Sequence, residues 1–169
     1  MVIGRPLDRR CGQILGRLPE NGGEKTVPLA KTVKRIRVIL ADDNKEMLDT
    51  VAELLESASE FDIVGTFADG RALVDAALEL KPDVAVIDIS MPIMNGIMAA
   101  AEIKRLGSTM DIIFLTVNED CDFVRAAFEI GASGYVVKRK MASDLKVAIY
   151  ACLAGRRFVS SGCEAVPGL

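Results

Sequence analysis

Short apolar runs alternate with amphipathic segments along the chain from Arg35 onward. The runs are rich in Val and Ile, and several are apolar at every position, which is typical of parallel strands that are covered on both faces. They predict five strands, at residues 37–40, 63–66, 84–87, 112–115 and 135–137.

The segments between these runs have the spacing of amphipathic helices. The first helix is expected to present one apolar face, made by Met47, Leu48, Val51, Leu54 and Leu55. Asn44 stands where a capping side chain is expected before this helix. Further helices are predicted at residues 69–80, 95–106, 119–130 and 142–154, and Gly155 supplies a stop for the last one.

Five β–α units in strict alternation predict an α/β fold, a doubly wound five-stranded parallel sheet with helices on both faces. We expect this fold to occupy residues 35–155. Residues 1–34 carry Gly, Pro and charge without sustained periodicity, which predicts a disordered or loosely ordered basic extension. A short helix near residues 11–18 is compatible with that extension, and residues 156–169 are predicted to form a short C-terminal tail.

Composition favours a globular domain and removes several classes of function. Half of the 169 residues are apolar and 27% are charged, which suffices to bury a core without disulfides or a structural metal. The chain has no His, which excludes His-based acid–base catalysis and His metal ligands. Its four cysteines form no CxxC pair, so zinc and thioredoxin-type chemistry have no support and we expect reduced thiols.

Charge and hydropathy bear on location and partners. No apolar run approaches the ~20 residues that span a bilayer, and the first residues lack a signal peptide, so we expect a cytoplasmic protein without a membrane partner. Eight basic and three acidic residues lie in the first 35 positions, although the net charge of the whole chain is −3. The remainder is therefore acidic, which disfavours specific DNA binding by the folded part.

Polar side chains stand where the predicted strands end. Asp42 and Asp43 follow the first strand, Asp88 ends the third, Thr116 ends the fourth and Lys138 ends the fifth. The carboxyl ends of strands in an open α/β sheet line one crevice, so these residues are expected to converge. Three close carboxylates repel one another, and an all-oxygen set without His or Cys favours Mg²⁺. Together with a lysine and a hydroxyl, such a site suits an incoming phosphoryl group.

Four segments in order resemble the signature segments of CheY-like response-regulator receiver domains. They are ILADDN (39–44), VIDISMPIMNG (86–96), IIFLT (112–116) and GYVVK (134–138). The stretch AIYACLAGRRFVSS (148–161) is similar to the end of receivers in the NarL-type, LuxR-like subclass. The resemblance implies the strand order 2-1-3-4-5.

The same resemblance implies roles for the acidic residues. Asp88 resembles the nucleophile that becomes an aspartyl phosphate. Asp43 resembles the direct Mg²⁺ ligand, Asp42 would assist through water, and Ser90 would lend its backbone carbonyl to the metal. A protein of this kind is not an enzyme in the usual sense, since it catalyses only its own phosphorylation and dephosphorylation.

The resemblance also implies a switch. Lys138 would pair with one phosphoryl oxygen and Thr116 with another, and Tyr135 would rotate from a more exposed to a more buried position as Thr116 moves. The alternative is a Tyr135 that is always buried. Many receivers have proline at the position of Arg139. The absence of that proline is similar to the pattern of receivers that precede LuxR-type DNA-binding domains.

The expected partners are a sensor histidine kinase or phosphotransfer protein and a downstream protein target that the sequence does not name, with homodimer formation left open. Two alternatives stay open: a pseudo-receiver that only binds, and the receiver fragment of a LuxR-type transcription regulator, since residues 156–169 are too few for a DNA-binding domain. A haloacid-dehalogenase-type phosphatase would need a second Asp where Ser90 stands. A flavodoxin-like flavin site would need a Ser-, Thr- and Gly-rich loop in place of residues 41–44.

Overall fold

The computed structural model describes residues 34–162 of the chain. The predicted loose extension, including the short helix near residues 11–18, lies outside the described residues apart from Lys34. The expected C-terminal tail is described as far as Gly162.

Helices and strands alternate as the sequence pattern predicts. In chain order the elements are β1 (Ile36–Ala41), α1 (Lys45–Glu56), β2 (Phe61–Phe67), α2 (Gly70–Leu80), β3 (Val84–Ile87), α3 (Gly96–Arg105), β4 (Asp111–Thr116), α4 (Cys121–Glu129), β5 (Gly134–Val137), a 3₁₀ turn (Lys138–Lys140), α5 (Met141–Leu153) and β6 (Phe158–Val159). The predicted limits of the last four helices agree with these to within two residues. No helix among residues 34–162 is both long and apolar enough to cross a membrane.

All strand pairs in the sheet are parallel, and the order is β2-β1-β3-β4-β5-β6. The parallel α/β sheet and the order of its first five strands confirm the expectation, but the predicted number of five strands is wrong. The sixth strand has two residues, which pair with Gly134 and Tyr135 on β5. Two residues are too few to show an apolar run in the sequence, so this strand was read as part of the tail.

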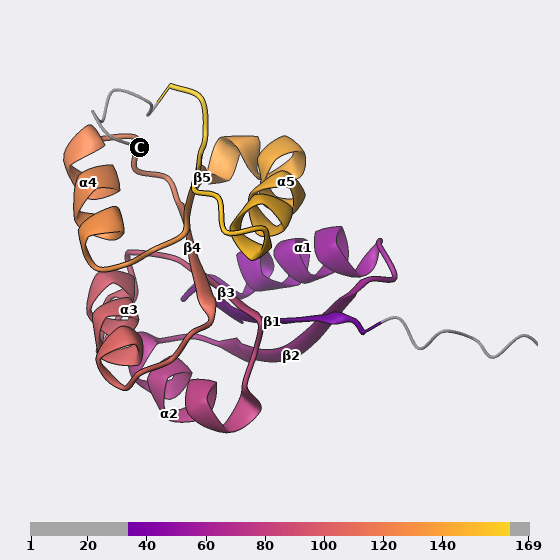
Figure 1. The fold of residues 1–169 in the computed structure, drawn as a ribbon, viewed down its shortest axis with the longest axis horizontal. Coiled ribbons are helices and arrows are strands. Elements are labelled where there is room, and N and C mark those ends of the chain that lie inside the picture. Colours follow the sequence, from indigo (N-terminus) through magenta and orange to yellow (C-terminus); the bar gives the residue numbers. More distant parts are fainter. Residues whose placement is uncertain (1–33, 163–169) are drawn as a thin grey trace, which may run out of the picture. The chain divides into compact units, whose positions relative to one another are not determined.

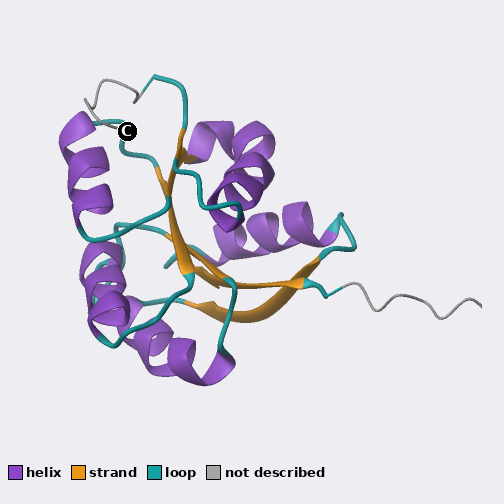
Figure 2. Ribbon diagram, viewed as in Figure 1, coloured by secondary structure: helices purple, strands orange, loops and turns teal. Residues whose placement is uncertain are grey.

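Helices cover both faces of the sheet, with α1 and α5 on one side and α2, α3 and α4 on the other (Figures 1 and 2). Each face has its own apolar core, because the central strands β3, β4 and β5 are buried along nearly their whole length. One core includes Leu55 of α1 and Ile149 of α5, and the other includes Leu73 of α2 and Phe128 of α4.

The helix ends follow from local hydrogen bonds. Asn44 caps α1 as predicted, because its side-chain oxygen accepts hydrogen bonds from the backbone N–H groups of Glu46 (2.9 Å) and Met47 (3.2 Å). Gly155 follows α5 with a φ of +72°, and its N–H donates to the Cys152 carbonyl at 2.8 Å. Gly tolerates this left-handed backbone, which confirms its place as the stop of the last helix.

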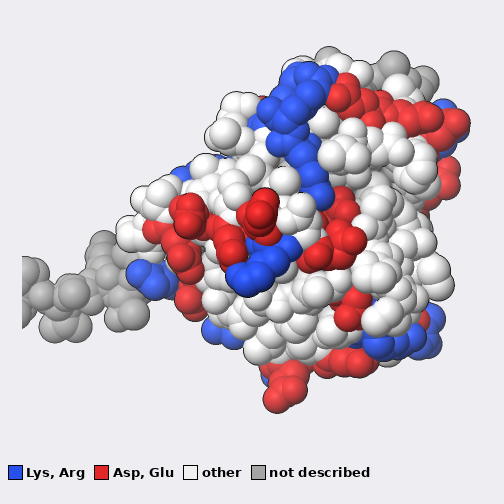
Figure 3. Space-filling view, turned by 180° about the vertical axis from the view of Figure 1, so that it is seen from behind, with Lys and Arg blue, Asp and Glu red and all other residues white. Residues whose placement is uncertain are grey.

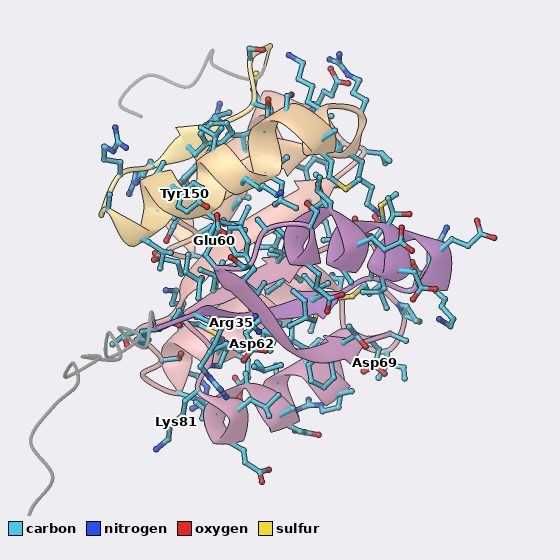
Figure 4. The ribbon with its side chains drawn as sticks, turned by 90° about the vertical axis from the view of Figure 1, so that its right-hand side faces the viewer. Arg35, Glu60, Asp62, Asp69, Lys81 and Tyr150 are labelled. Carbon is cyan, nitrogen blue, oxygen red and sulfur yellow. The ribbon has the colours of Figure 1, made fainter. Side chains whose placement is uncertain are left out.

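A side-chain contact fastens α5 to the start of β2. The Tyr150 hydroxyl donates a 2.5 Å hydrogen bond to the carboxylate of Glu60, and the two labelled side chains point toward one another in Figure 4. The Tyr150 ring also lies 5.7 Å, between centroids, from the ring of Phe61. These contacts tie α5, which packs mainly over β5 and β4, to the start of β2.

Candidate functional site

The four neighbouring strands β1, β3, β4 and β5 bring the predicted polar residues to one edge of the sheet. Asp42 directly follows β1, Asp88 directly follows β3, Thr116 is the last residue of β4 and Lys138 directly follows β5. The sheet ladder still holds the backbone here, since the Asp88 N–H donates to the Ala41 carbonyl at 2.7 Å. The convergence predicted from the strand ends is therefore present.

Three carboxylates meet at this edge. Asp42, Asp43 and Asp88 each offer an oxygen, and these oxygens all lie within 4.8 Å of one another. Asp42 and Asp88 are buried, whereas Asp43 is exposed. Backbone N–H groups hold the buried pair in place: Asn44 donates to Asp42 Oδ1 at 2.9 Å, and Ser90 donates to Asp88 Oδ2 at 3.0 Å.

Lys138 bridges the two buried carboxylates. Its Nζ lies 2.6 Å from Asp42 Oδ2 and 3.3 Å from Asp88 Oδ1, and its side chain is only 14% exposed. Burial acts to lower the pKa of Lys138, but the hydrogen bond to Asp42 and the charge of Asp88 outweigh it, so the pKa is raised above its usual value. Lys138 is therefore charged at neutral pH, and it offsets part of the carboxylate repulsion.

One ammonium does not balance the acidic cluster. Burial raises the pKa of Asp88, and the neighbouring Asp42 carboxylate adds to this rise, although Lys138 and the Ser90 N–H act in the opposite direction. Burial and carboxylate repulsion thus exceed what Lys138 supplies. An additional cation beside Asp88 would therefore stabilise its ionised form.

The donor atoms fit a hard divalent cation. They are carboxylate oxygens from Asp42, Asp43 and Asp88, with no nitrogen or sulfur donor among them. Asp43 is exposed, so a cation bound there would also be in contact with water. Mg²⁺ keeps several waters and uses few carboxylates, so this set suits it better than zinc. Ser90, whose backbone carbonyl is the expected fourth ligand, lies beside the cluster, since its N–H bonds to Asp88.

Thr116 and Tyr135 both contact the loop that follows β4. Thr116 is 1% exposed, and its Oγ1 accepts a 3.3 Å hydrogen bond from the Asn118 N–H. Tyr135 is fully buried, and its hydroxyl donates to the Asn118 carbonyl at 3.1 Å. Tyr135 therefore occupies the buried position that is expected for the phosphorylated state.

Two features of the site were not predicted. Gly96 packs so closely behind the site that a Cβ there would lie 2.1 Å from the Asp88 carbonyl oxygen. Arg139 forms a two-point ion pair with Glu119, with both contacts at 2.5 Å, which joins the loop after β4 to the turn after β5. The Asn-Gly step in residues 86–96 was a signal for Gly96, but no sequence pattern pairs residues 119 and 139.

The surface on the side opposite to the view of Figure 1 shows a mixture of charges. Acidic side chains gather around the middle of this face, and a column of basic side chains lies above them (Figure 3). Clustered acidic groups attract cations, and basic groups beside them favour an anion once the acidic groups are neutralised.

The fold and this site define a class of protein: a single α/β module with an acidic pocket and one lysine at the carboxyl ends of its strands. The family model of the response regulator receiver domain matches residues 38–150. The chain belongs to the family of response regulator receiver domains.

Curated relatives agree with this assignment. The transcriptional regulatory protein LiaR of Bacillus subtilis is 38% identical over 120 residues, which cover 71% of this chain and 57% of LiaR. The uncharacterized transcriptional regulatory protein YvfU of the same species is 32% identical over 125 residues, which cover 74% of this chain and 62% of YvfU. The chain thus spans less than two thirds of the length of these relatives.

Solved structures agree as well. A LuxR-family response regulator from Aurantimonas sp. SI85-9A1 superimposes with a TM-score of 0.74 at 32% identity, over 77% of this chain and 93% of the other. The isolated receiver domain of RcsB from Salmonella enterica, in the presence of the phosphomimetic BeF₃⁻, gives a TM-score of 0.71 at 30% identity, over 77% and 96% of the two chains. The similarity to LuxR-type receivers is therefore confirmed.

Proposed function

We propose that Asp88 accepts a phosphoryl group from a partner histidine kinase or phosphotransfer protein, and that the phosphorylated chain changes its binding of a downstream protein. One observation carries the proposal. Asp88 is a buried carboxylate at a strand end, with the Lys138 ammonium at 3.3 Å and two further carboxylates within 4.8 Å. Membership of the receiver family supports the same reaction.

The transfer needs positioning and charge neutralisation more than covalent help. An oxygen of the Asp88 carboxylate attacks the phosphorus, and the bond between phosphorus and the donor's imidazole nitrogen breaks. The electron pair of that bond stays on the nitrogen, which takes a proton from solvent. The product is an acyl phosphate on Asp88, and Lys138 and Thr116 would pair with its phosphoryl oxygens.

Asp42, Asp43, Asp88 and the Ser90 carbonyl would hold Mg²⁺ during this transfer. The bound cation would neutralise charge on the carboxylates and on the phosphoryl oxygens. Lys138 now occupies the space between Asp42 and Asp88, so it would give up its 2.6 Å contact with Asp42 when it turns toward the phosphoryl group. We therefore assign Lys138 two partners in succession.

Phosphorylation of Asp88 can be tested without the cognate kinase. The protein is incubated with Mg²⁺ and acetyl phosphate, and the added mass of one phosphoryl group is mapped by mass spectrometry. Asp88→Asn keeps the size but removes the nucleophile, so it should take no phosphate, whereas the exposed control Asp49→Asn should behave as wild type. Phosphorylation of Asp88→Asn at the wild-type rate would remove Asp88 from this role.

The LuxR-type relatives suggest two further points. They are named as transcriptional regulators, and a structure of RcsB contains two dimers bound to two parallel DNAs. We propose that residues 34–162 act as the phosphorylated part of such a system and do not read DNA sequence themselves, because all five helices described pack on the sheet. Dimer formation by this chain can be measured by light scattering with and without beryllofluoride.

A further inference from the structure

The short strand β6 covers the outer edge of β5. Its two residues pair with Gly134 and Tyr135, in parallel register, and the segment is seen in yellow beside β5 in Figure 1. Without β6, β5 would be the edge of the sheet and its outer side would be open. One of the two residues that pair with β6 is therefore the predicted switch residue Tyr135.

Ser160 fixes the end of β6 from inside the protein. Its side chain is fully buried, and its Oγ donates a 2.6 Å hydrogen bond to the Asp144 carboxylate. The same Oγ accepts a 3.2 Å hydrogen bond from the Val137 N–H, which leaves no unsatisfied amide where the ladder ends. The Ser160 N–H in turn donates to the Tyr135 carbonyl at 2.9 Å.

Contacts on either side of Ser160 hold the rest of the segment. The Lys140 ammonium donates to the Ser161 carbonyl at 2.6 Å. The guanidinium of Arg157 lies 5.2 Å from the ring centroid of Phe128 on α4, a cation–π contact. The segment from Arg157 to Ser161 thus contacts α4, β5 and the turn before α5.

Val159 stands beside Tyr135 on the same face of the sheet. The two residues are register partners, so their side chains point the same way, and Val159 packs against the core cluster that contains the Tyr135 ring. Phe114 of β4 is the register partner of Tyr135 on its other side, and Val124 and Phe128 of α4 belong to the same core cluster as the ring. Val159 therefore stands beside Tyr135 on the side away from Phe114, at the outer edge of β5.

We propose that β6 is a latch that keeps Tyr135 buried even without a phosphoryl group, so that the ring turns outward only when β6 leaves the edge of β5 or when the Val159 side chain no longer fills that edge. Val159 blocks the path of the ring, and Ser160 holds Val159 in place. In this chain the ring and the C-terminal segment then move together. This inference rests on the proposed function for its biological use, but the position of the ring is independent of phosphorylation chemistry.

The latch has a consequence for ligand affinity. If the phosphorylated state requires a buried Tyr135, a latched ring spares the phosphoryl group the cost of moving it. Loosening the latch lets the ring sample the outer position. The apparent dissociation constant for beryllofluoride then rises, because it equals the intrinsic constant divided by the fraction of molecules with a buried ring. The rise is about twofold if half of the rings are outside. The reciprocal effect is that beryllofluoride should redock β6 in the loosened variants.

The test uses the fact that the chain has only two tyrosines, Tyr135 and Tyr150. Selective ring labelling gives two NMR signals, which Tyr150→Phe assigns, and a soluble paramagnetic agent measures the exposure of each ring. The variants are Val159→Ala, which opens the path, and Ser160→Ala, which loosens the anchor. Ser59→Ala, an exposed serine in the turn between α1 and β2, is the matched control.

Without any phosphoryl analogue, Tyr135 should be inaccessible in wild type and in Ser59→Ala, and accessible in Val159→Ala and Ser160→Ala. Hydrogen exchange at residues 158–161 should rise by about tenfold or more in Ser160→Ala. An exposed Tyr135 in the wild type would overturn the latch, as would a ring that stays inaccessible in Val159→Ala. If Ser160→Ala fails to fold, Val159→Ala and the wild type decide. None of these measurements depends on whether Asp88 takes phosphate.

Discussion

Replacing Lys138 by Met should destabilise the folded protein in a pH-dependent manner. Met keeps the apolar stem of the side chain but removes the ammonium that lies 2.6 Å from Asp42 and 3.3 Å from Asp88. Both carboxylates are 5% exposed in their side chains and would face one another without a cation. Removing one partner of a buried ion pair typically costs about 3–5 kcal/mol.

Protonation sets a scale for this loss. If one of the two carboxyls takes up a proton, the pair carries a single negative charge. Each carboxyl already accepts a backbone hydrogen bond, Asp42 from Asn44 and Asp88 from Ser90, so the remaining charge has a donor. Keeping a carboxyl of ordinary pKa ~3.9 protonated costs about 1.4 kcal/mol per pH unit, which is about 4 kcal/mol at pH 7 and about 1.5 kcal/mol at pH 5. We expect a loss of about 2–4 kcal/mol at pH 7 that shrinks to about 1.5 kcal/mol or less at pH 5.

The sign follows from Asp88. A pKa that is raised in the folded state means that folding favours the protonated carboxyl. The unfavourable contribution of Asp88 is therefore present above this pKa and fades as the pH falls through it. Removing Lys138 raises the pKa of Asp88 further, so the variant should regain stability over a wider range of falling pH than the wild type.

Urea unfolding followed by far-UV circular dichroism, at pH 7 and pH 5 in the absence of Mg²⁺, measures both losses. Adding Mg²⁺ at pH 7 should recover part of the stability of Lys138→Met, because a cation returns to the carboxylates. Lys45→Met is the control, since Lys45 is 83% exposed and pairs with Asp49 at the surface. A loss at pH 7 under about 0.5 kcal/mol, or one of equal size at both pH values, would refute the charge argument.

Two further substitutions test the site. Asp43→Ala should weaken Mg²⁺ binding by about tenfold or more in a calorimetric titration, because it removes one of few carboxylate ligands, whereas Asp49→Ala should not; equal affinities would exclude Asp43 as a ligand. Gly96→Ala should lower the free energy of unfolding in urea by about 1–3 kcal/mol, because the new Cβ would meet the Asp88 carbonyl oxygen at 2.1 Å. It should also slow phosphorylation by acetyl phosphate. A variant as stable as the wild type would show that the backbone can shift there without destabilising the fold.

The position of the site could be predicted from the sequence because it depends on topology rather than on detail. Apolar runs of four residues mark buried parallel strands, and every such strand ends on the same side of the sheet. Once Asp42, Asp88 and Lys138 were placed at strand ends, their convergence followed. Their side-chain pairing did not follow, because nothing in the sequence decides which carboxylate Lys138 contacts more closely.

The contacts of the loop after β4 could not be predicted from the sequence, for a different reason. The Tyr135 hydroxyl and Arg139 both hold the loop after β4, at Asn118 and Glu119, from positions about twenty residues away in the chain. Loops carry no periodicity, so these pairings depend on a backbone path that only the folded structure supplies. The buried position of Tyr135 belongs to this group, since it depends on what covers the ring.

The strand β6 shows why the edge of the sheet was the hardest part to predict. Phe158, Val159 and Ser160 do alternate between the two faces: Phe158 packs against one core, Val159 packs against the other, and Ser160 is buried beside Asp144. Three residues cannot establish a period, and a serine in a strand reads as exposed until Val137 and Asp144 are seen around it. The segment that covers Tyr135 and decides whether the ring can move therefore resembles a linker in its sequence alone. The role of this segment depends on β5, the strand with which it pairs.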